Sequence, residues 1–118
     1  MIYLLWAFVD FLTVVVFVIV GRSVHGHVDS IAGLASTAYP FLVGLFLGWV
    51  SIRAWRRPTQ IFPVGVTVWL STAVIGQIIR LLVGQGSAVP FVLVSLGFFA
   101  LTMLGWRLVV KVVLAITK

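Results

Sequence analysis

The residue in this sequence best suited to chemistry is Asp10, an acid inside a long apolar stretch. It is the only charged side chain in residues 4–20. A carboxyl group in a bilayer costs about 3 kcal/mol unless it is protonated, paired or faces a water-filled cavity. Two roles follow for Asp10. It is either a hydrogen-bonded packing residue without a transport role, or a proton or cation site, because intramembrane acids mark such pathways.

Depth in the membrane makes Arg107 the best ion-pair partner for Asp10. At 1.5 Å per helical residue, Asp10 lies about 10 Å from the membrane face that holds both termini, and Arg107 about 5 Å from it. Arg80 lies near the opposite face, about 15–20 Å from Asp10. Hydroxyl groups of Thr72 and Thr102, or a trapped water, are alternative partners. The sequence therefore predicts an ion or proton site formed by Asp10, Thr72 and Arg107.

A second polar cluster is expected at the opposite face. Its members are Arg22, His25, His27, Asp29 and Arg80. Two guanidinium groups, two imidazoles and a carboxylate can capture an anion, respond to pH or bind a lipid head group. The alternative is a solvated loop with arginines that extend to head groups. Two histidines and one acid form an incomplete ligand set, so we expect neither a metal site nor a cofactor.

The elements that position these residues follow from composition. The chain has 118 residues, of which 63% are hydrophobic and 8% charged, whereas soluble domains carry about a quarter charged residues. Because a span needs roughly 20 apolar residues and lone apolar runs cross lipid as helices, we predict an all-α integral membrane protein. It has one domain, residues 1–118, with four transmembrane helices at about 2–21, 31–52, 60–83 and 88–110.

The second predicted helix carries a face of small residues. Gly44 and Gly48 form a GxxxG pattern, which lets two helices approach closely. Pro40 lies inside the same helix and should kink it or leave its carbonyl partner free, because proline has no backbone N–H for the helical hydrogen bond.

Basic residues predict the orientation. One side of the membrane receives Arg53, Arg56, Arg57, Arg107, Lys111 and Lys118, and the other receives Arg22 and Arg80. By the positive-inside rule, both termini should be cytoplasmic, which places two hairpins of the same orientation in the cell inner membrane. Since the basic residues lie at the ends of apolar runs, we expect no binding to nucleic acid.

Several kinds of chemistry find no support in the sequence. The chain has no cysteine, which excludes disulfides and thiol catalysis. It contains no P-loop, G-x-S-x-G or H-E-x-x-H motif and no pair of intramembrane acids, so we expect that it is not an enzyme. The first apolar run lacks a basic start and a signal-cleavage motif, and we expect it to be a retained helix.

A set of these residues resembles a known family. They are Asp10, Gly21-Arg22 with His25, Pro40-Phe41, Gly48-Trp49, Trp69, Thr72, Gly76, Arg80 and Trp106-Arg107. The chain resembles, over essentially its whole length, a family of small four-helix prokaryotic membrane proteins, largely actinobacterial, catalogued as a domain of unknown function. That resemblance implies a fold and a location but no activity. The chain is also similar in layout to small multidrug resistance exporters, but those have a glutamate in the first helix, and the charge bias here opposes their antiparallel dimer.

Two functional hypotheses remain open. The first is a small transporter or channel component that uses Asp10, with Arg22 and Arg80 attracting anions or head groups at the outer mouth. The second is a structural or interaction subunit of a membrane complex, in which the small face of the second helix and the pair Asp10–Arg107 serve assembly. In both, the partners are the lipid bilayer and either further copies of the chain or other subunits.

Overall fold

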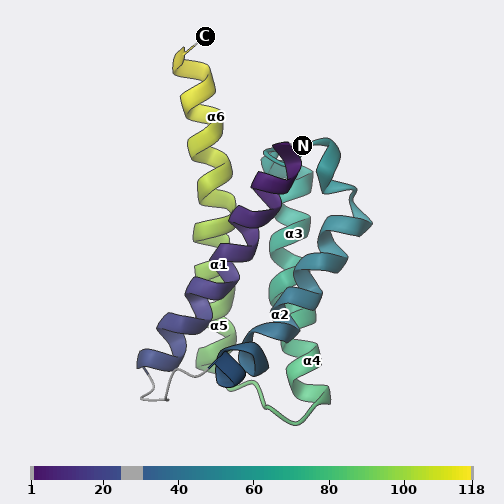
Figure 1. Cartoon of the computed structure of the whole chain (residues 1–118), viewed down its shortest axis with the longest axis vertical. Helices are drawn as coiled ribbons and strands as arrows, with labels where there is room; N and C mark the ends of the chain where they lie inside the picture. The colour runs from purple at the N-terminus through teal and green to yellow at the C-terminus, as the bar shows by residue number, and fades with distance from the viewer. Residues whose placement is uncertain (1, 25–30, 118) are drawn as a thin grey trace.

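The computed structural model describes residues 2–24 and 31–117, and these form four long helical segments (Figure 1). The first two are α1 (Ile2–Val24) and α2 (Ile31–Ser51), and the short helix η1 (Ala54–Arg56) follows them. The third consists of η2 (Ile61–Gly65), α3 (Val66–Leu70), η3 (Ser71–Ile75) and α4 (Gly76–Leu82). The fourth consists of α5 (Val89–Phe99), η4 (Ala100–Leu104) and α6 (Gly105–Thr117).

All four segments are long and apolar enough to cross a membrane. They confirm the predicted all-α fold with four candidate spans. The fourth segment is longer than expected, because its helix continues to Thr117 and not to about residue 110. Residues 106–117 contain no glycine or proline, so nothing in the local sequence ends the helix earlier.

The third and fourth segments contain wider turns of the π type, η3 and η4. Backbone angles at their boundaries remain helical, as at Ser71 and Ala100, so each segment is one continuous helix. The start of the third segment is less regular, because Phe62 has an extended backbone. Single π turns inside α-helices shift the side chains that follow onto a new face. The faces of these two segments are therefore hard to predict from a regular helical period.

Phenylalanine rings fill the centre of the bundle. Phe17, Phe41 and Phe99 are nearly fully buried, with ring centroids 4.8 to 5.8 Å apart. Phe91 and Phe98 pack on the same cluster, in tilted contact with Phe17. These rings come from the first, second and fourth segments. They form an apolar layer between these segments.

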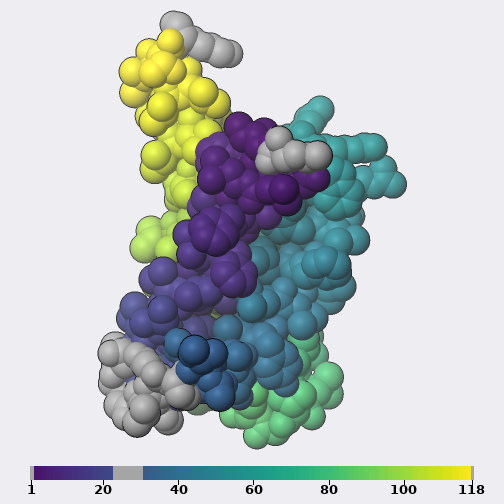
Figure 2. Space-filling model, viewed as in Figure 1, coloured from purple at the N-terminus to yellow at the C-terminus, as the bar shows by residue number. Residues whose placement is uncertain are grey.

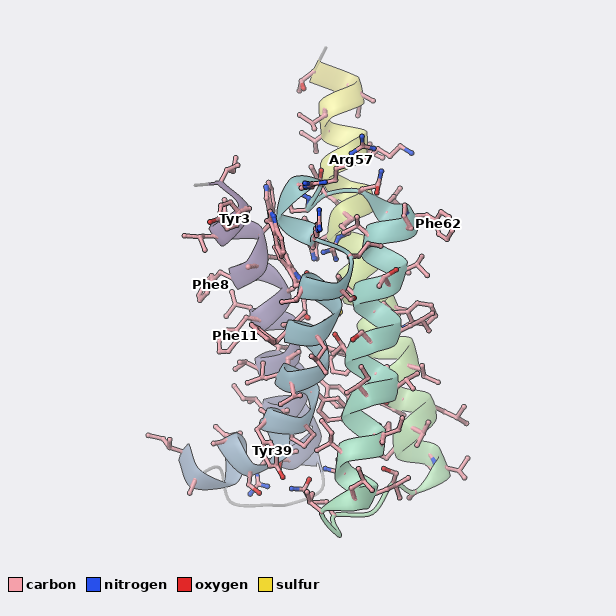
Figure 3. All side chains as sticks on the ribbon, turned by 90° about the vertical axis from the view of Figure 1, so that its right-hand side faces the viewer. Tyr3, Phe8, Phe11, Tyr39, Arg57 and Phe62 are labelled. Atoms are coloured by element: carbon pink, nitrogen blue, oxygen red, sulfur yellow. The ribbon has the colours of Figure 1, made fainter. Side chains whose placement is uncertain are left out.

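The small face of α2 packs inside the molecule. A Cβ atom built on Gly44 would lie 2.5 Å from the backbone oxygen of Ser71, and one on Gly48 would lie 2.9 Å from the Ser71 Cβ. The predicted close approach at the GxxxG pattern is therefore confirmed, and its partner is η3 of the same chain. The predicted kink is also present: α2 changes direction beside the labelled Tyr39, at Pro40 (Figure 3).

The two ends of the bundle differ. One end, which we call the basic end, carries η1 and both ends of the chain (Figure 1). The turn between α4 and α5 lies at the opposite end. The molecule measures 47 × 27 × 26 Å, and the last turns of α6 project beyond the other helices at the basic end (Figures 1 and 2).

Candidate functional site

The Asp10 carboxylate accepts four hydrogen bonds. The Trp49 indole N–H donates to Oδ2 at 2.9 Å and the Trp106 indole N–H donates to Oδ1 at 2.8 Å. Arg107 donates from Nη2 to Oδ2 at 2.7 Å and from Nη1 to Oδ1 at 3.1 Å. All four partners are N–H groups, so the acid acts only as an acceptor, as an ionised carboxylate does.

Arg107 also donates to two backbone carbonyl groups. Its Nε donates to the Pro58 oxygen at 2.9 Å, and its Nη1 also donates to the Met103 oxygen at 3.0 Å. The two-pronged contact with Asp10 matches the planar fork of a guanidinium group, which a lysine ammonium cannot reproduce. Arg107 therefore connects α1, η4 and the loop before the third segment.

Neighbouring residues fix the position of both side chains. The Arg107 guanidinium lies 4.3 Å from the centroid of the Trp106 ring, and Trp6 stacks on Trp106 with centroids 5.1 Å apart. A Cβ on Gly65 would lie 2.8 Å from Arg107 Cδ, so the absence of a side chain there makes room for Arg107. The third segment thus also contacts this group of residues, which we call the Asp10 centre: Asp10, Trp49, Trp106 and Arg107.

The ion pair within the Asp10 centre is closed to solvent. Asp10 and Arg107 are both 0% exposed, and neither lines any of the three cavities described below. Removing one partner from such a buried pair costs about 3–5 kcal/mol, because the other charge is left uncompensated. The geometry is that of a structural ion pair with satisfied donors.

The sequence predicted part of this arrangement. The expected ion pair between Asp10 and Arg107 is present. Thr72 does not join it: its hydroxyl donates to the Val68 carbonyl of its own helix, at 2.7 Å, and its backbone packs against Gly44. Thr102 likewise donates to a carbonyl in its own helix. Both threonines fail as partners because the helices turn their hydroxyls toward the local backbone, a common alternative for this side chain.

Sequence reasoning missed the two tryptophans as partners of Asp10. Trp49 and Trp106 are named above only among the residues that carry the family resemblance. The signal that could have identified them is chemical, since an indole N–H is a donor without an acceptor and so suits a buried carboxylate. Trp106 is also adjacent to Arg107 in the chain.

The end of the bundle opposite the basic end holds a cavity of about 180 Å³, with polar side chains in its lining. It is smaller than the groove on α1 and α2 described below. Arg22 and Arg80 both line the cavity, with Thr37 and the Phe91 ring among their neighbours. Arg22 donates to the Thr37 hydroxyl at 3.1 Å. Arg80 donates to the Gln85 side chain and lies 4.5 Å from the Phe91 ring centroid. The structure therefore brings together two of the five residues predicted for this cluster. The other three, His25, His27 and Asp29, lie outside the described residues.

A buried hydrogen-bonded group near this end was not predicted. Gln77 donates to the Ser95 hydroxyl at 2.9 Å and accepts from Ser87 at 2.6 Å. These contacts join the third and fourth segments. None of the three groups changes charge in the physiological range, and their hydrogen bonds hold the two segments together.

Comparison with known proteins gives one match. A family model described as Protein of unknown function (DUF3054) matches residues 7–110. The match confirms the resemblance expected from the sequence to a family without an assigned activity. No curated protein and no solved structure matches the chain.

Proposed function

The chain belongs to this family of unknown function, and from that premise we propose that it is a structural or interaction subunit of a membrane complex. The observation that carries the proposal is the closure of the Asp10 centre. A carboxylate that carries a proton or a cation must meet water or the ion during its cycle. Asp10 instead has four protein donors and no exposed surface.

The aromatic core supports the same proposal. Along their helices, Phe17, Phe41 and Phe99 each lie between a residue of the Asp10 centre and a residue that lines the cavity at Arg22 and Arg80. Phe17 also lines that cavity. All three rings are at most 5% exposed. Charged species do not cross such an apolar layer without hydrogen-bonding groups or water. The two polar regions therefore do not form a continuous path within one copy of the chain.

The projecting end of α6 supplies a surface for a partner. The fourth segment has 29 residues, which correspond to about 43 Å of helix and exceed a hydrocarbon core of about 30 Å. Val109, Val112, Val113 and Ile116 are all exposed, by 46 to 77%. At spacings of three and four residues they lie on one face of the helix. We call these four residues the C-terminal stripe.

The proposal includes an orientation and an assembly. The basic end faces the cytoplasm of a bacterial cell, because basic residues concentrate there. The C-terminal stripe then contacts another copy of the chain or a second subunit near the inner face of the inner membrane. The proposal gives the chain no catalytic role.

Transport is tested in proteoliposomes. Purified chain is reconstituted with a pH-sensitive dye inside the vesicles, and flux is compared with vesicles that contain Asp10→Asn. We expect wild type to show no more flux than empty vesicles. A pH-dependent flux that disappears in folded Asp10→Asn would instead establish the transporter hypothesis and overturn the proposal.

Assembly is tested by the mass of the complex extracted from native membranes. We expect the wild-type complex to have a larger mass than the monomer. The variant Val112→Gln/Ile116→Gln should have the mass of the monomer. Leu114→Gln is the matched control, because Leu114 lies on the same helix and lines a groove beside η2. A wild-type chain that is monomeric in native membranes and after purification would contradict the subunit role.

A reporter active only in the cytoplasm, fused after Lys118, should be active if the orientation is correct.

A further inference from the structure

An apolar groove of about 490 Å³ runs along the outer side of α1 and α2 from the basic end. Ten residues line it: Tyr3, Leu4, Ala7, Phe11, Leu42, Leu45, Phe46, Trp49, Val50 and Trp55. Figure 2 shows the face on which α1 and α2 are seen together, and Figure 3 places Tyr3 and Phe11 along one side of α1. The volume falls within the range of roughly 300–1,000 Å³ that is typical of small-molecule sites.

The lining of the groove is almost entirely apolar, with Tyr3 and Trp55 at one end. Its residues on α1 extend from Tyr3 to Phe11, which corresponds to about 12 Å of helix. Tyr3 and Trp55 lie toward the basic end, and both are side chains that favour the head-group region of a bilayer. Apart from Trp49, the other lining residues are aliphatic or phenylalanine. Such a lining suits the linear apolar part of an occupant whose polar group lies beyond the basic end of the groove.

Charge at the mouth identifies the polar group. Arg53 and Arg56 flank Trp55 in the chain, and both are exposed. Arg53 follows the end of α2, and its backbone is left-handed, with φ of 53°. Glycine is the usual residue at such a position after a helix. Each basic side chain close to an anionic lipid surface adds binding energy. Neither arginine lines the groove itself, but Arg56 is next in the chain to the lining residue Trp55. Two exposed arginines just beyond this end of the groove would be complementary to a phosphate group.

We propose that this groove binds an anionic phospholipid, with one acyl chain between α1 and α2 and the phosphate at Arg53 and Arg56. The site adjoins the Asp10 centre, because Trp49 lines the groove and also donates to Asp10. A bound chain packs against the indole that holds this carboxylate. The lipid site does not depend on whether the protein joins a complex.

Tryptophan fluorescence measures this binding directly, since Trp49 and Trp55 line the groove. The full chain in detergent micelles is titrated with phosphatidylglycerol that carries bromine atoms on its acyl chains, which quench indole emission on contact. Brominated phosphatidylcholine is titrated in parallel. We expect saturable quenching by phosphatidylglycerol, with a half-saturation concentration at least about fivefold lower than that of phosphatidylcholine, the effect of one basic side chain near an anionic lipid.

Two variants test the two parts of the site. Arg53→Gln/Arg56→Gln should raise the half-saturation concentration for phosphatidylglycerol to that of phosphatidylcholine. Ala7→Phe should reduce the extent of quenching by both lipids, because the added ring fills the groove. The matched controls are Arg57→Gln/Lys111→Gln, which removes equal charge at the same end, and Val94→Phe, which adds a ring on an exposed face of α5. Both controls should bind as wild type does.

Three outcomes would overturn the proposal. Equal, non-saturating quenching by both lipids would show only general contact with the bilayer. An equal loss in Arg57→Gln/Lys111→Gln would assign the preference to overall charge. Displacement of the brominated lipid by inorganic phosphate alone would show that the acyl chain is not bound. The exposed arginine substitutions keep the test valid if Ala7→Phe fails to fold, and circular dichroism checks each variant.

Discussion

The Asp10 centre and the cavity at Arg22 and Arg80 use similar side chains in opposite ways. Each has a guanidinium group beside an aromatic ring, at 4.3 Å for Arg107 on Trp106 and 4.5 Å for Arg80 on Phe91. Arg107 is paired with a carboxylate and fully buried. Arg80 donates to the neutral side chain of Gln85 and to the Gly86 carbonyl, and it lines a cavity.

The difference shows what a buried charge requires in an apolar interior. Arg107 is fully enclosed by other side chains, so its charge must be balanced by an anion. Arg80 lines a cavity at the opposite end of the bundle, where neutral acceptors are sufficient. The Asp10 centre is accordingly a structural element of the bundle, and the Arg80 region is adaptable. Four experiments test this account, in order of the expected effect.

The largest effect is expected at Asp10. Asp10→Asn should lower the free energy of unfolding by about 3–5 kcal/mol, because it leaves Arg107 buried without a counter-charge. The substitution also places an amide N–H₂ donor opposite the indole and guanidinium donors, which cannot accept a hydrogen bond from it. Equilibrium unfolding in mixed micelles measures the change. A loss below about 1 kcal/mol, the range of an exposed ion pair, would show that the centre is not sealed.

Next in size is the contact between α2 and η3. Gly44→Ala should cost about 1–3 kcal/mol, the range for overpacking, although alanine favours helix more than glycine does. The added Cβ would meet the Ser71 backbone oxygen. Gly97→Ala is the control, since no atom lies within 4 Å of its Cβ position. It should be neutral or stabilising, and equal losses in the two variants would refute the close approach.

A smaller effect is expected for each tryptophan donor. Trp49→Phe and Trp106→Phe should each cost about 1–2 kcal/mol, as expected for a hydrogen bond to a charged group. In an Asp10→Leu background the same substitutions should cost less, because the acceptor is absent. Unfolding free energies of the paired variants give the comparison. Equal costs in both backgrounds would mean that the indoles contribute through packing alone.

The smallest effect is expected at Arg80. Arg80→Gln should change the unfolding free energy by less than about 1 kcal/mol, because its contacts are with neutral groups near the membrane face. Thermal unfolding of the purified variant is sufficient to measure this. A loss comparable with that of Asp10→Asn would remove the contrast between the two regions.

The spans and the ion pair could be predicted because composition and depth determine them. An acid and an arginine at similar depth have few other ways to be satisfied in lipid. The direction in which each side chain points around its helix was harder to predict. One residue corresponds to about 100° around the helix axis, so a shift of one residue turns a side chain onto a different face. The π turns in η3 and η4 introduce such shifts. Thr72 was therefore assigned to the wrong contacts, and the indole donors Trp49 and Trp106 were missed.

The central claim is that Asp10 and Arg107 form one closed structural pair, and a double-mutant cycle tests it most directly. The free energy of unfolding is measured for wild type, Asp10→Leu, Arg107→Leu and the double variant. We predict a coupling energy of about 2–3 kcal/mol, with the double variant more stable than the sum of the single losses implies. Additive losses, with coupling near zero, would contradict the account.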